Sequence, residues 1–267
     1  MLQSISHHHD THHLRARQNS IDALAAAMND GKAHLLLACS GSVATIKLPN
    51  MIQALSKYPS SRLSIRVVLT PSASRFLAGQ SPEQPTVSSI SDMPNVDGVY
   101  VDADEWKAPW VRGASIMHIE LRRWADVLVI APLSANTMAK IVGGFSDSLL
   151  TSVVRAWDPW GELDAGAVNK RPKKRHIIVA PAMNTAMWRH PVTKKQLRVL
   201  EEEWGVRKSQ NGTDGESQSQ STGDEGDGWF EVLRPQSKAL ACGDVGSGAM
   251  IEWTEIVSVI EERLGLT

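Results

Sequence analysis

Short apolar runs alternate with amphipathic stretches along the middle of the chain. Four of these runs are rich in aliphatic residues and end in turn residues, and a stretch of helical character follows each: His34–Cys39, Leu63–Thr70, Asp126–Ala131 and His176–Ala180. Continuous apolar runs of this length are typical of strands that are buried on both faces. The pattern therefore predicts a parallel sheet with helices on both sides. Trp229–Leu233 is a candidate for a last strand, and Glu252–Leu264 for a closing helix.

The order of strands and helices also limits the topology. A helix that connects two parallel strands crosses the sheet in a right-handed sense in nearly every known case. With helices on both faces, the economical arrangement is a doubly wound α/β sheet, which is the fold class we predict. In the Asp126–Ala131 strand, we expect Pro132 to end the ladder of hydrogen bonds.

Two segments lie outside this pattern. Residues 1–30 contain five of the nine histidines (His7, His8, His9, His12 and His13) and are either a metal-binding tract or, as we favour, a disordered leader. Residues 207–228 contain no aliphatic or aromatic side chain, so they cannot bury enough apolar area to offset the entropy of ordering. We favour a disordered, tolerated surface insertion over a regulatory docking loop. The remainder, residues 31–267, is expected to form one domain.

Composition excludes several classes of protein. The 267 residues carry 28 basic and 29 acidic side chains, so a net charge of −1 provides no basic field for nucleic acid. No apolar stretch reaches the roughly 18 residues that a membrane-spanning helix needs. The two cysteines, Cys39 and Cys242, are too few for a disulfide scaffold or a four-thiolate zinc site. We expect a soluble intracellular protein without a metal site.

Candidate binding residues follow the ends of the predicted strands, where ligands bind in doubly wound sheets. Gly41-Ser42-Val43-Ala44 is either a tight turn or a cradle for a single phosphate, because a turn that enters a helix presents free N–H groups. Ser134, Asn136 and Thr137 either cap a helix or contact a flat polar heterocycle. Asn184, in an apolar setting, is either a satisfied cap or a ligand-binding amide.

Two residues could carry proton chemistry. His118 lies among apolar residues and is either a structural histidine or a proton acceptor near neutral pH. Cys242 lies in a loop with three glycines that can fold closely over a ligand, so it is either a proton donor or reactive thiol, or an incidental loop residue. Cys39 falls in an apolar strand and is expected to be inert.

Six segments in this order carry a resemblance to a known family: GSVA (41–44), ADEW (103–106), HIELRRWAD (118–126), APLSANT (131–137), PAMNTAMW (181–188) and LACGDVGSGAM (240–250). They closely resemble the phosphopantothenoylcysteine decarboxylases, which belong to the homo-oligomeric flavin-containing cysteine decarboxylases. The likeness extends from Lys32 to Leu264 without residues 207–228.

The resemblance implies a flavodoxin-like (Rossmann-like) subunit, a homotrimer, and FMN bound near a subunit boundary. It implies that His118 and Cys242 are catalytic, with Cys242 as the proton donor of a flexible clamp. The substrate would be bound by Asn184, which holds its carboxylate, and by Ala241 and Met250. The residues expected at the flavin are Gly41, Ser42, Val43, Thr70, Ser134, Ala135, Asn136 and Ala182.

The implied reaction converts 4'-phosphopantothenoylcysteine to 4'-phosphopantetheine and CO2 in coenzyme A biosynthesis. Loss of CO2 from a cysteine carboxylate leaves a carbanion without an electron sink, so the route is transient thiol oxidation, CO2 loss and re-reduction, with the flavin as electron acceptor. The resemblance also implies a cytoplasmic protein that could enter the nucleus. The alternative is a regulatory protein of the same fold, like the halotolerance relatives that inhibit a protein phosphatase.

Overall fold

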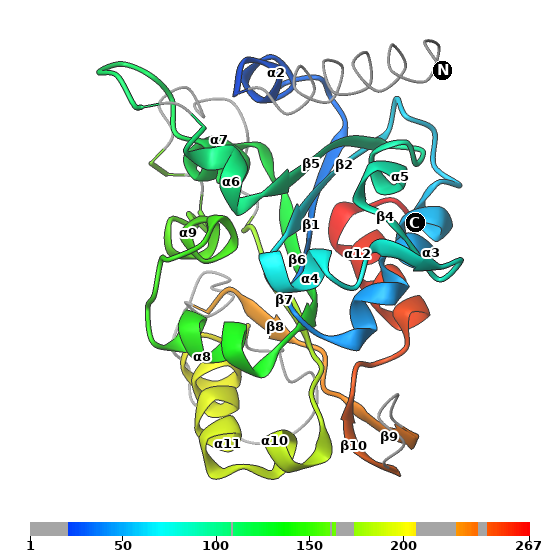
Figure 1. Cartoon of the computed structure of the whole chain (residues 1–267). Coiled ribbons are helices and arrows are strands. Elements are labelled where there is room, and N and C mark those ends of the chain that lie inside the picture. Colours follow the sequence, from blue (N-terminus) through cyan, green and yellow to red (C-terminus); the bar gives the residue numbers. More distant parts are fainter. Residues whose placement is uncertain (1–20, 108, 161, 164–173, 207–227, 240–244) are drawn as a thin grey trace, which may run out of the picture.

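A six-stranded parallel sheet forms the centre of the molecule (Figure 1). The computed structural model describes residues 21–107, 109–160, 162–163, 174–206, 228–239 and 245–267. The strands, in their order across the sheet, are β5 (Val96–Val101), β2 (Leu63–Leu69), β1 (Ala33–Cys39), β6 (Val127–Leu133), β7 (Ile177–Pro181) and β8 (Phe230–Val232). All neighbouring pairs are parallel.

The path of the chain through the sheet confirms the predicted doubly wound fold. From β1 the chain moves outward to β2 and β5, returns to β6 on the other side of β1, and moves outward again to β7 and β8. This is the strand order of dinucleotide-binding Rossmann folds, so Rossmann-like describes the subunit more closely than flavodoxin-like. The direction of winding reverses between β1 and β6.

Helices cover both faces because alternate residues of each strand face opposite sides. In β1, Leu35, Leu37 and Cys39 pack toward α3 (Leu48–Leu55) and α12 (Trp253–Leu264). Leu36 and Ala38 pack on the opposite side. That side is covered by α7 (Met117–Trp124), α8 (Ala135–Val142), α9 (Leu149–Arg155) and α11 (Pro191–Arg198). Full burial of each such leucine stabilises the fold by about 1.5–3 kcal/mol relative to exposure.

Shorter elements complete the described part of the chain. They are α2 (Ile21–Ala26), the 3-10 helix η1 (Val43–Lys47), α4 (Pro71–Ser74), α5 (Val87–Ser91), α6 (Asp102–Glu105), α10 (Thr185–Arg189) and the π-helical turn η2 (Val199–Glu203). Two antiparallel hairpins pair β3 (Ala78–Ser81) with β4 (Gln84–Thr86) and β9 (Gln236–Ala239) with β10 (Val245–Ala249). Among the described residues, none of the helices is long and apolar enough to span a membrane.

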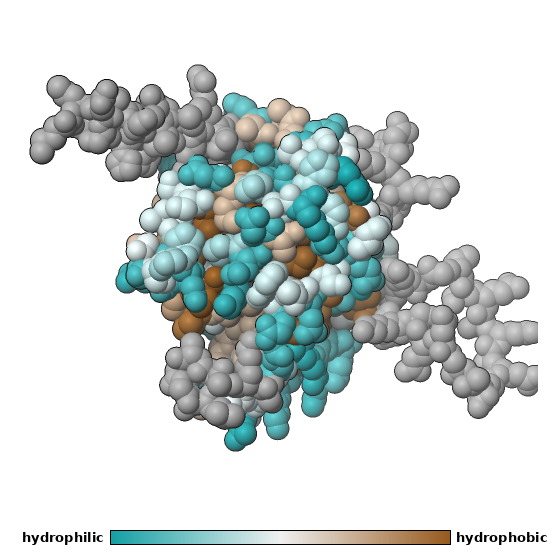
Figure 2. Space-filling view, turned by 90° about the vertical axis from the view of Figure 1, so that its right-hand side faces the viewer, coloured by the Kyte–Doolittle hydropathy of each residue, from teal (hydrophilic) through white to brown (hydrophobic). Residues whose placement is uncertain are grey.

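The molecular surface on the side of α3 and α5 is mainly polar. Figure 2 shows hydrophobic residues on this face only as small areas separated by hydrophilic ones. Large hydrophobic side chains are exposed elsewhere on the molecule, including Trp106, Trp110 and Val111 between α6 and α7.

Three details of the sequence prediction are wrong. Strand β5 was missed because Asp97 and Gly98 interrupt its apolar run, which an edge strand tolerates. We expected the disordered leader to extend to residue 30, but α2 forms over Ile21–Ala26, where Leu24 is fully buried against α7 and β1. The helix expected after Leu63–Thr70 is limited to the four residues of α4, which ends at Ser74. The predictions for residues 1–20 and 207–227 lie outside the described residues.

Pro132 does not end its strand as predicted. Strand β6 continues to Leu133, which pairs with Pro181 after a shift in register. Pro132 cannot donate a hydrogen bond, but its carbonyl accepts from the backbone N–H and the hydroxyl of Ser40 (3.1 and 2.9 Å). These bonds join the end of β6 to the end of β1, where the candidate site lies.

Candidate functional site

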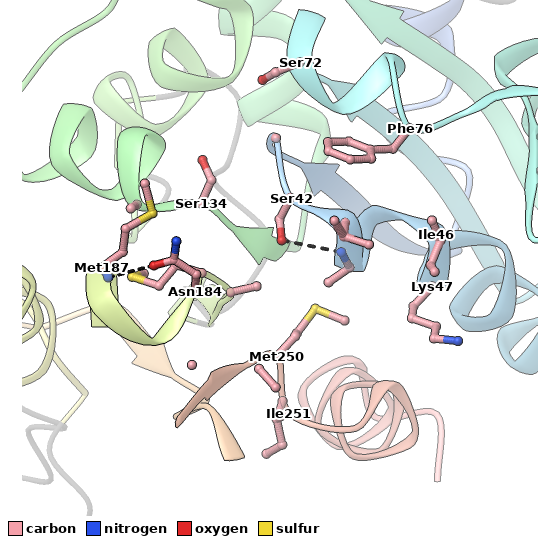
Figure 3. A pocket seen from close by; sticks show the side chains of 18 of the residues that line it. Ser42, Ile46, Lys47, Ser72, Phe76, Ser134, Asn184, Met187, Met250 and Ile251 are labelled. Carbon is pink, nitrogen blue, oxygen red and sulfur yellow. Dashed lines mark hydrogen bonds between the residues drawn. The ribbon is translucent and has the colours of Figure 1, made fainter. Parts of the chain in front are cut away.

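A cavity of about 780 Å³ opens at the carboxyl ends of β1, β6 and β7, beside the point where the winding reverses (Figure 3). Its size is within the usual range for small-molecule sites, and its position is where ligands bind in such sheets. The described residues that line it are Gly41, Ser42, Val43, Ala44, Ile46, Lys47, Ser72, Phe76, Ser134, Ala135, Asn136, Ala182, Met183, Asn184, Met187, Gly248, Ala249, Met250, Ile251, Glu252 and Trp253.

The loop after β1 approaches the loop after β2 very closely. A Cβ atom on Gly41 would lie 2.5 Å from the Oγ and 2.6 Å from the Cβ of Ser72. Only glycine fits at this position without displacing Ser72. Ser42 caps η1, since its Oγ accepts from the backbone N–H of Ala44 at 3.4 Å. Backbone N–H groups and two hydroxyls thus meet at this end of the cavity, which suits an anionic group.

The loop after β6 brings Ser134 to the cavity. Its Oγ caps α8 by accepting from the backbone N–H of Thr137, and its own N–H donates to Oγ of Ser40 at 2.7 Å. Ala135 and Asn136 also line the cavity, whereas Thr137 does not. Helix capping is therefore observed. The side chain of Asn136 lines the cavity and has no hydrogen-bond partner among the described residues, so it can contact a ligand.

Asn184 follows β7 and caps α10. Its Oδ1 accepts from the backbone N–H of Met187 at 2.8 Å, as drawn in Figure 3. Because the carbonyl oxygen is used in this bond, the amide Nδ2 is the group left to donate elsewhere. Nδ2 has no hydrogen-bond partner among the described residues, and Asn184 lines the cavity. The two alternatives from the sequence therefore coexist: the oxygen caps the helix and the NH₂ group can bind a ligand.

Apolar side chains form the remainder of the wall. Ala182 and Met250, which the sequence analysis named as candidate binding residues, are buried and line the cavity. Strand β10 is held against α10 because the backbone N–H of Met183 donates to the carbonyl of Gly248 at 2.9 Å. At Gly248 the backbone has a φ of +135°, and an added Cβ would lie 2.6 Å from the Met183 carbonyl oxygen. Glycine at this position lets β10 approach the site closely.

Sequence reasoning missed several residues that line the cavity, two of them after β2. Ser72 and Phe76 line the cavity, whereas the predicted Thr70 does not. Thr70 caps α4, and its hydroxyl lies 3.2 Å from that of Ser72, so it supports Ser72 instead of lining the site. The Thr-Pro-Ser sequence at the end of a predicted strand is the signal that could have identified Ser72, because a helix begins there.

His118 is remote from this cavity within one chain. It is the second residue of α7, and no residue of α7 lines the cavity. In Figure 1, α7 lies near α2, at the opposite end of the molecule from α10 and β10. The imidazole Nδ1 lies 2.5 Å from Oε1 of Glu105. Cys242 and Ala241, the other predicted residues, lie outside the described part of the chain.

Charge in and near the cavity is limited. Of the described residues that line it, Lys47 and Glu252 carry a charge. The described residues contain no cluster of three or more histidine, cysteine or acidic side chains that could hold a metal ion. Cys39 lies beneath the cavity in β1, where burial raises the pKa of its thiol, and its S–H donates to the carbonyl of Ala131. This cysteine is a packed core residue.

Comparison with known proteins places these features in a family. Residues 24–265 match the Flavoprotein family. A phosphopantothenoylcysteine decarboxylase from Arabidopsis thaliana is 38% identical over 229 residues, which cover 86% of this chain and 84% of that protein. By contrast, the chain spans only 30% to 41% of the length of three fungal relatives that it matches.

Two solved structures are similar over most of the chain. One is a cysteine-to-serine mutant of PPC decarboxylase in complex with pantothenoylaminoethenethiol, with 37% identity, a TM-score of 0.61, and coverage of 86% of this chain and 97% of that one. The other is the FMN-binding protein AtHal3, with 36% identity, a TM-score of 0.61, and coverage of 88% and 98%. The chain therefore belongs to the Flavoprotein family, in the group that contains the phosphopantothenoylcysteine decarboxylases.

Proposed function

We propose that this protein binds FMN and decarboxylates 4'-phosphopantothenoylcysteine to 4'-phosphopantetheine, a step of coenzyme A biosynthesis. The observation that carries the proposal is the convergence of separate motifs on one cavity. Residues from 41–43, 134–136, 182–184 and 250 are far apart in the sequence and line the same space. The relatives named as decarboxylases and the neighbour named as FMN-binding support the reaction and the flavin.

The described residues fit FMN. Because Gly41 has no side chain, its loop lies close to Ser72. Backbone N–H groups and the hydroxyls of Ser42 and Ser72 therefore lie together at one end of the cavity, and these groups suit a phosphate. Apolar side chains of Ala182 and Met250 suit the faces of a flat ring system, while Asn136 can satisfy polar atoms at its edge. When bound there, FMN would supply a two-electron acceptor that takes electrons from the substrate thiol and later returns them.

Asn184 is the residue that we assign to the substrate carboxylate. Its Nδ2 can donate a hydrogen bond, while the cap to Met187 fixes the orientation of the amide. An uncharged donor holds the carboxylate without adding a positive charge that would stabilise it against loss of CO2. This favours the transition state over the bound substrate.

Proton transfers are assigned to His118 and Cys242. His118 would accept a proton during oxidation of the thiol, and Cys242 would donate one during the return of electrons. Because α7 does not reach the cavity of its own chain, we propose that His118 serves the site of a neighbouring copy in a homotrimer. The exposed Trp106, Trp110 and Val111, which precede α7, are apolar residues that such an interface would cover.

The proposal is tested by incubating the flavin-loaded protein with 4'-phosphopantothenoylcysteine without oxygen and quantifying CO2 and 4'-phosphopantetheine. Equal amounts of both products are expected. His118→Asn should retain flavin and release no CO2. His190→Asn is a matched control, because His190 is exposed, lies outside the cavity, and caps α11 in a way that asparagine can reproduce. If the wild type releases no CO2, the proposed function is wrong.

The regulatory alternative predicts a different result. Some fungal relatives bear the name SIS2, one of them as a subunit of a phosphopantothenoylcysteine decarboxylase. A protein that acts by inhibiting a phosphatase would inhibit it in the absence of substrate, and His118→Asn would leave this inhibition unchanged. The enzymatic proposal predicts CO2 release that this variant abolishes.

A further inference from the structure

Apart from the exposed Trp106, the ADEW segment, residues 103–106, has no role in the proposed function. Its glutamate, Glu105, ends the short helix α6 and turns inward, with a side chain that is only 4% exposed, whereas the adjacent Trp106 is 63% exposed. The group that it meets is His118, thirteen residues later in the chain. A carboxylate withdrawn from water beside a functional histidine requires an explanation, because such burial is costly without a compensating partner.

One oxygen of Glu105 makes two contacts with His118. Oε1 accepts from the backbone N–H of His118 at 3.3 Å and lies 2.5 Å from its ring Nδ1. The first contact satisfies a free N–H in the first turn of α7, which Ile116 cannot cap. The second fixes the ring. Since both contacts use the same oxygen, the orientation of the imidazole is tied to the start of its own helix.

The contact also determines which ring nitrogen carries the proton. An ionised carboxylate only accepts hydrogen bonds, so neutral His118 must hold its proton on Nδ1. Nε2 then keeps its lone pair. It has no hydrogen-bond partner among the described residues and is not one of the buried unpaired atoms, so it is open to a reactant. This is the tautomer that a general base acting through Nε2 requires.

Helix α6 is held firmly enough to position the carboxylate. Asp102 accepts from the backbone N–H of Leu149 at the start of α9 (3.1 Å), and Asp104 accepts from the backbone N–H of Val101 (2.8 Å). The three acidic side chains of this helix therefore have separate partners. Of the partners of these three side chains, His118, the partner of Glu105, is the one with a role in the proposed reaction.

We propose that Glu105 is a positioning residue for His118, which sets its tautomer, fixes its orientation and stabilises the imidazolium that forms when Nε2 accepts a proton. The inference rests on the proposed function, because it assumes that His118 acts as a base. Serine proteases use a buried aspartate for the same three purposes, and its replacement by the amide presents the wrong tautomer.

The test compares Glu105→Gln with Asp102→Asn. Glutamine keeps the size of Glu105 but loses the charge. It can place either its oxygen or its NH₂ group at the one position that meets both the backbone N–H and the ring of His118. We expect kcat to fall roughly 10- to 1000-fold, with KM changed less than about threefold and with flavin content and melting temperature preserved. Asp102→Asn removes one charge from the same helix and should retain kcat within about twofold, since Asn can still accept from Leu149.

A second measurement does not depend on activity. In protein labelled with 15N-histidine, the His118 resonances, identified by their loss in His118→Asn, should report a proton on Nδ1 in the wild type and a mixture of tautomers in Glu105→Gln. An unchanged tautomer, or a kcat within about twofold of wild type, overturns the inference. A loss of kcat that is matched by a fall in melting temperature or flavin content assigns Glu105 a merely structural role. If the wild type releases no CO2, the proposed function fails, and the tautomer alone then decides whether the pair exists.

Discussion

The close contact between Gly41 and Ser72 makes a sharp prediction about flavin binding. Gly41→Ala would place a Cβ 2.5 Å from Oγ of Ser72, whereas ordinary contacts begin at 3.4 Å. Ser72 must therefore move by close to 1 Å, away from the hydroxyl of Thr70 or into the cavity. Overpacking of this kind costs about 1–3 kcal/mol. If FMN binding requires the original geometry, its dissociation constant should rise roughly 5- to 150-fold.

A double-mutant cycle separates this contact from other effects of the substitution. Ser72→Gly removes both atoms that the new Cβ would meet, and the next nearest atom, the carbonyl carbon of Ser72, lies at 3.7 Å. Gly41→Ala/Ser72→Gly should therefore bind FMN about as well as Ser72→Gly alone. Titration of the apoprotein with FMN, followed by quenching of flavin fluorescence, measures all four affinities. The reasoning is refuted if Gly41→Ala binds FMN like the wild type, or if the double variant binds no better than Gly41→Ala.

Three further predictions concern single side chains. Thiol titration of the native protein should detect Cys242 and not Cys39, because complete burial raises the pKa of the Cys39 thiol. Cys242→Ser should therefore show no reactive thiol until the protein unfolds, and a reactive thiol in the folded variant would contradict the burial of Cys39. Burial raises the pKa of Asp102 above its ordinary value of 3.8, so ionisation of this carboxyl in the folded protein lowers stability as the pH rises above 3.8. In urea unfolding, Asp102→Asn should therefore be more stable than the wild type at neutral pH, and the difference should disappear below pH 3.8. A difference that does not change with pH would contradict the raised pKa. Asn184→Asp keeps the helix cap but opposes the substrate carboxylate with a negative charge, so KM should rise with flavin content unchanged, whereas the exposed control Asn50→Asp should match wild type.

The central strands were predictable because burial on both faces makes them mainly apolar. All residues of β2, β6 and β7, and all of β1 except Ala33, are buried, and their runs stand out in the sequence. Edge strand β5 was not predictable in this way, because Asp97 interrupts its apolar run. The carboxylate of Asp97 accepts a hydrogen bond from Ser64. Helix α2 depends on one buried residue, Leu24, which is too weak a signal for a six-residue helix.

The site was partly predictable for a related reason. The ends of the parallel strands meet at one edge of the sheet, so Gly41, Ser134 and Asn184 could be expected to lie together. The contact of Ser72 with Gly41 depends on how two loops approach each other, and the contact of Glu105 with His118 depends on where α6 docks. Neither follows from local spacing. The prediction for Cys242 lies outside the described residues and stays a prediction.

The central claim is that this chain holds FMN in the cavity at the winding reversal of its sheet. The most direct measurement is the absorption spectrum of the purified protein, combined with quantification of the flavin that it releases on unfolding. We predict a yellow protein that contains, or takes up from solution, one FMN per chain. A colourless protein that binds no added FMN would contradict this account.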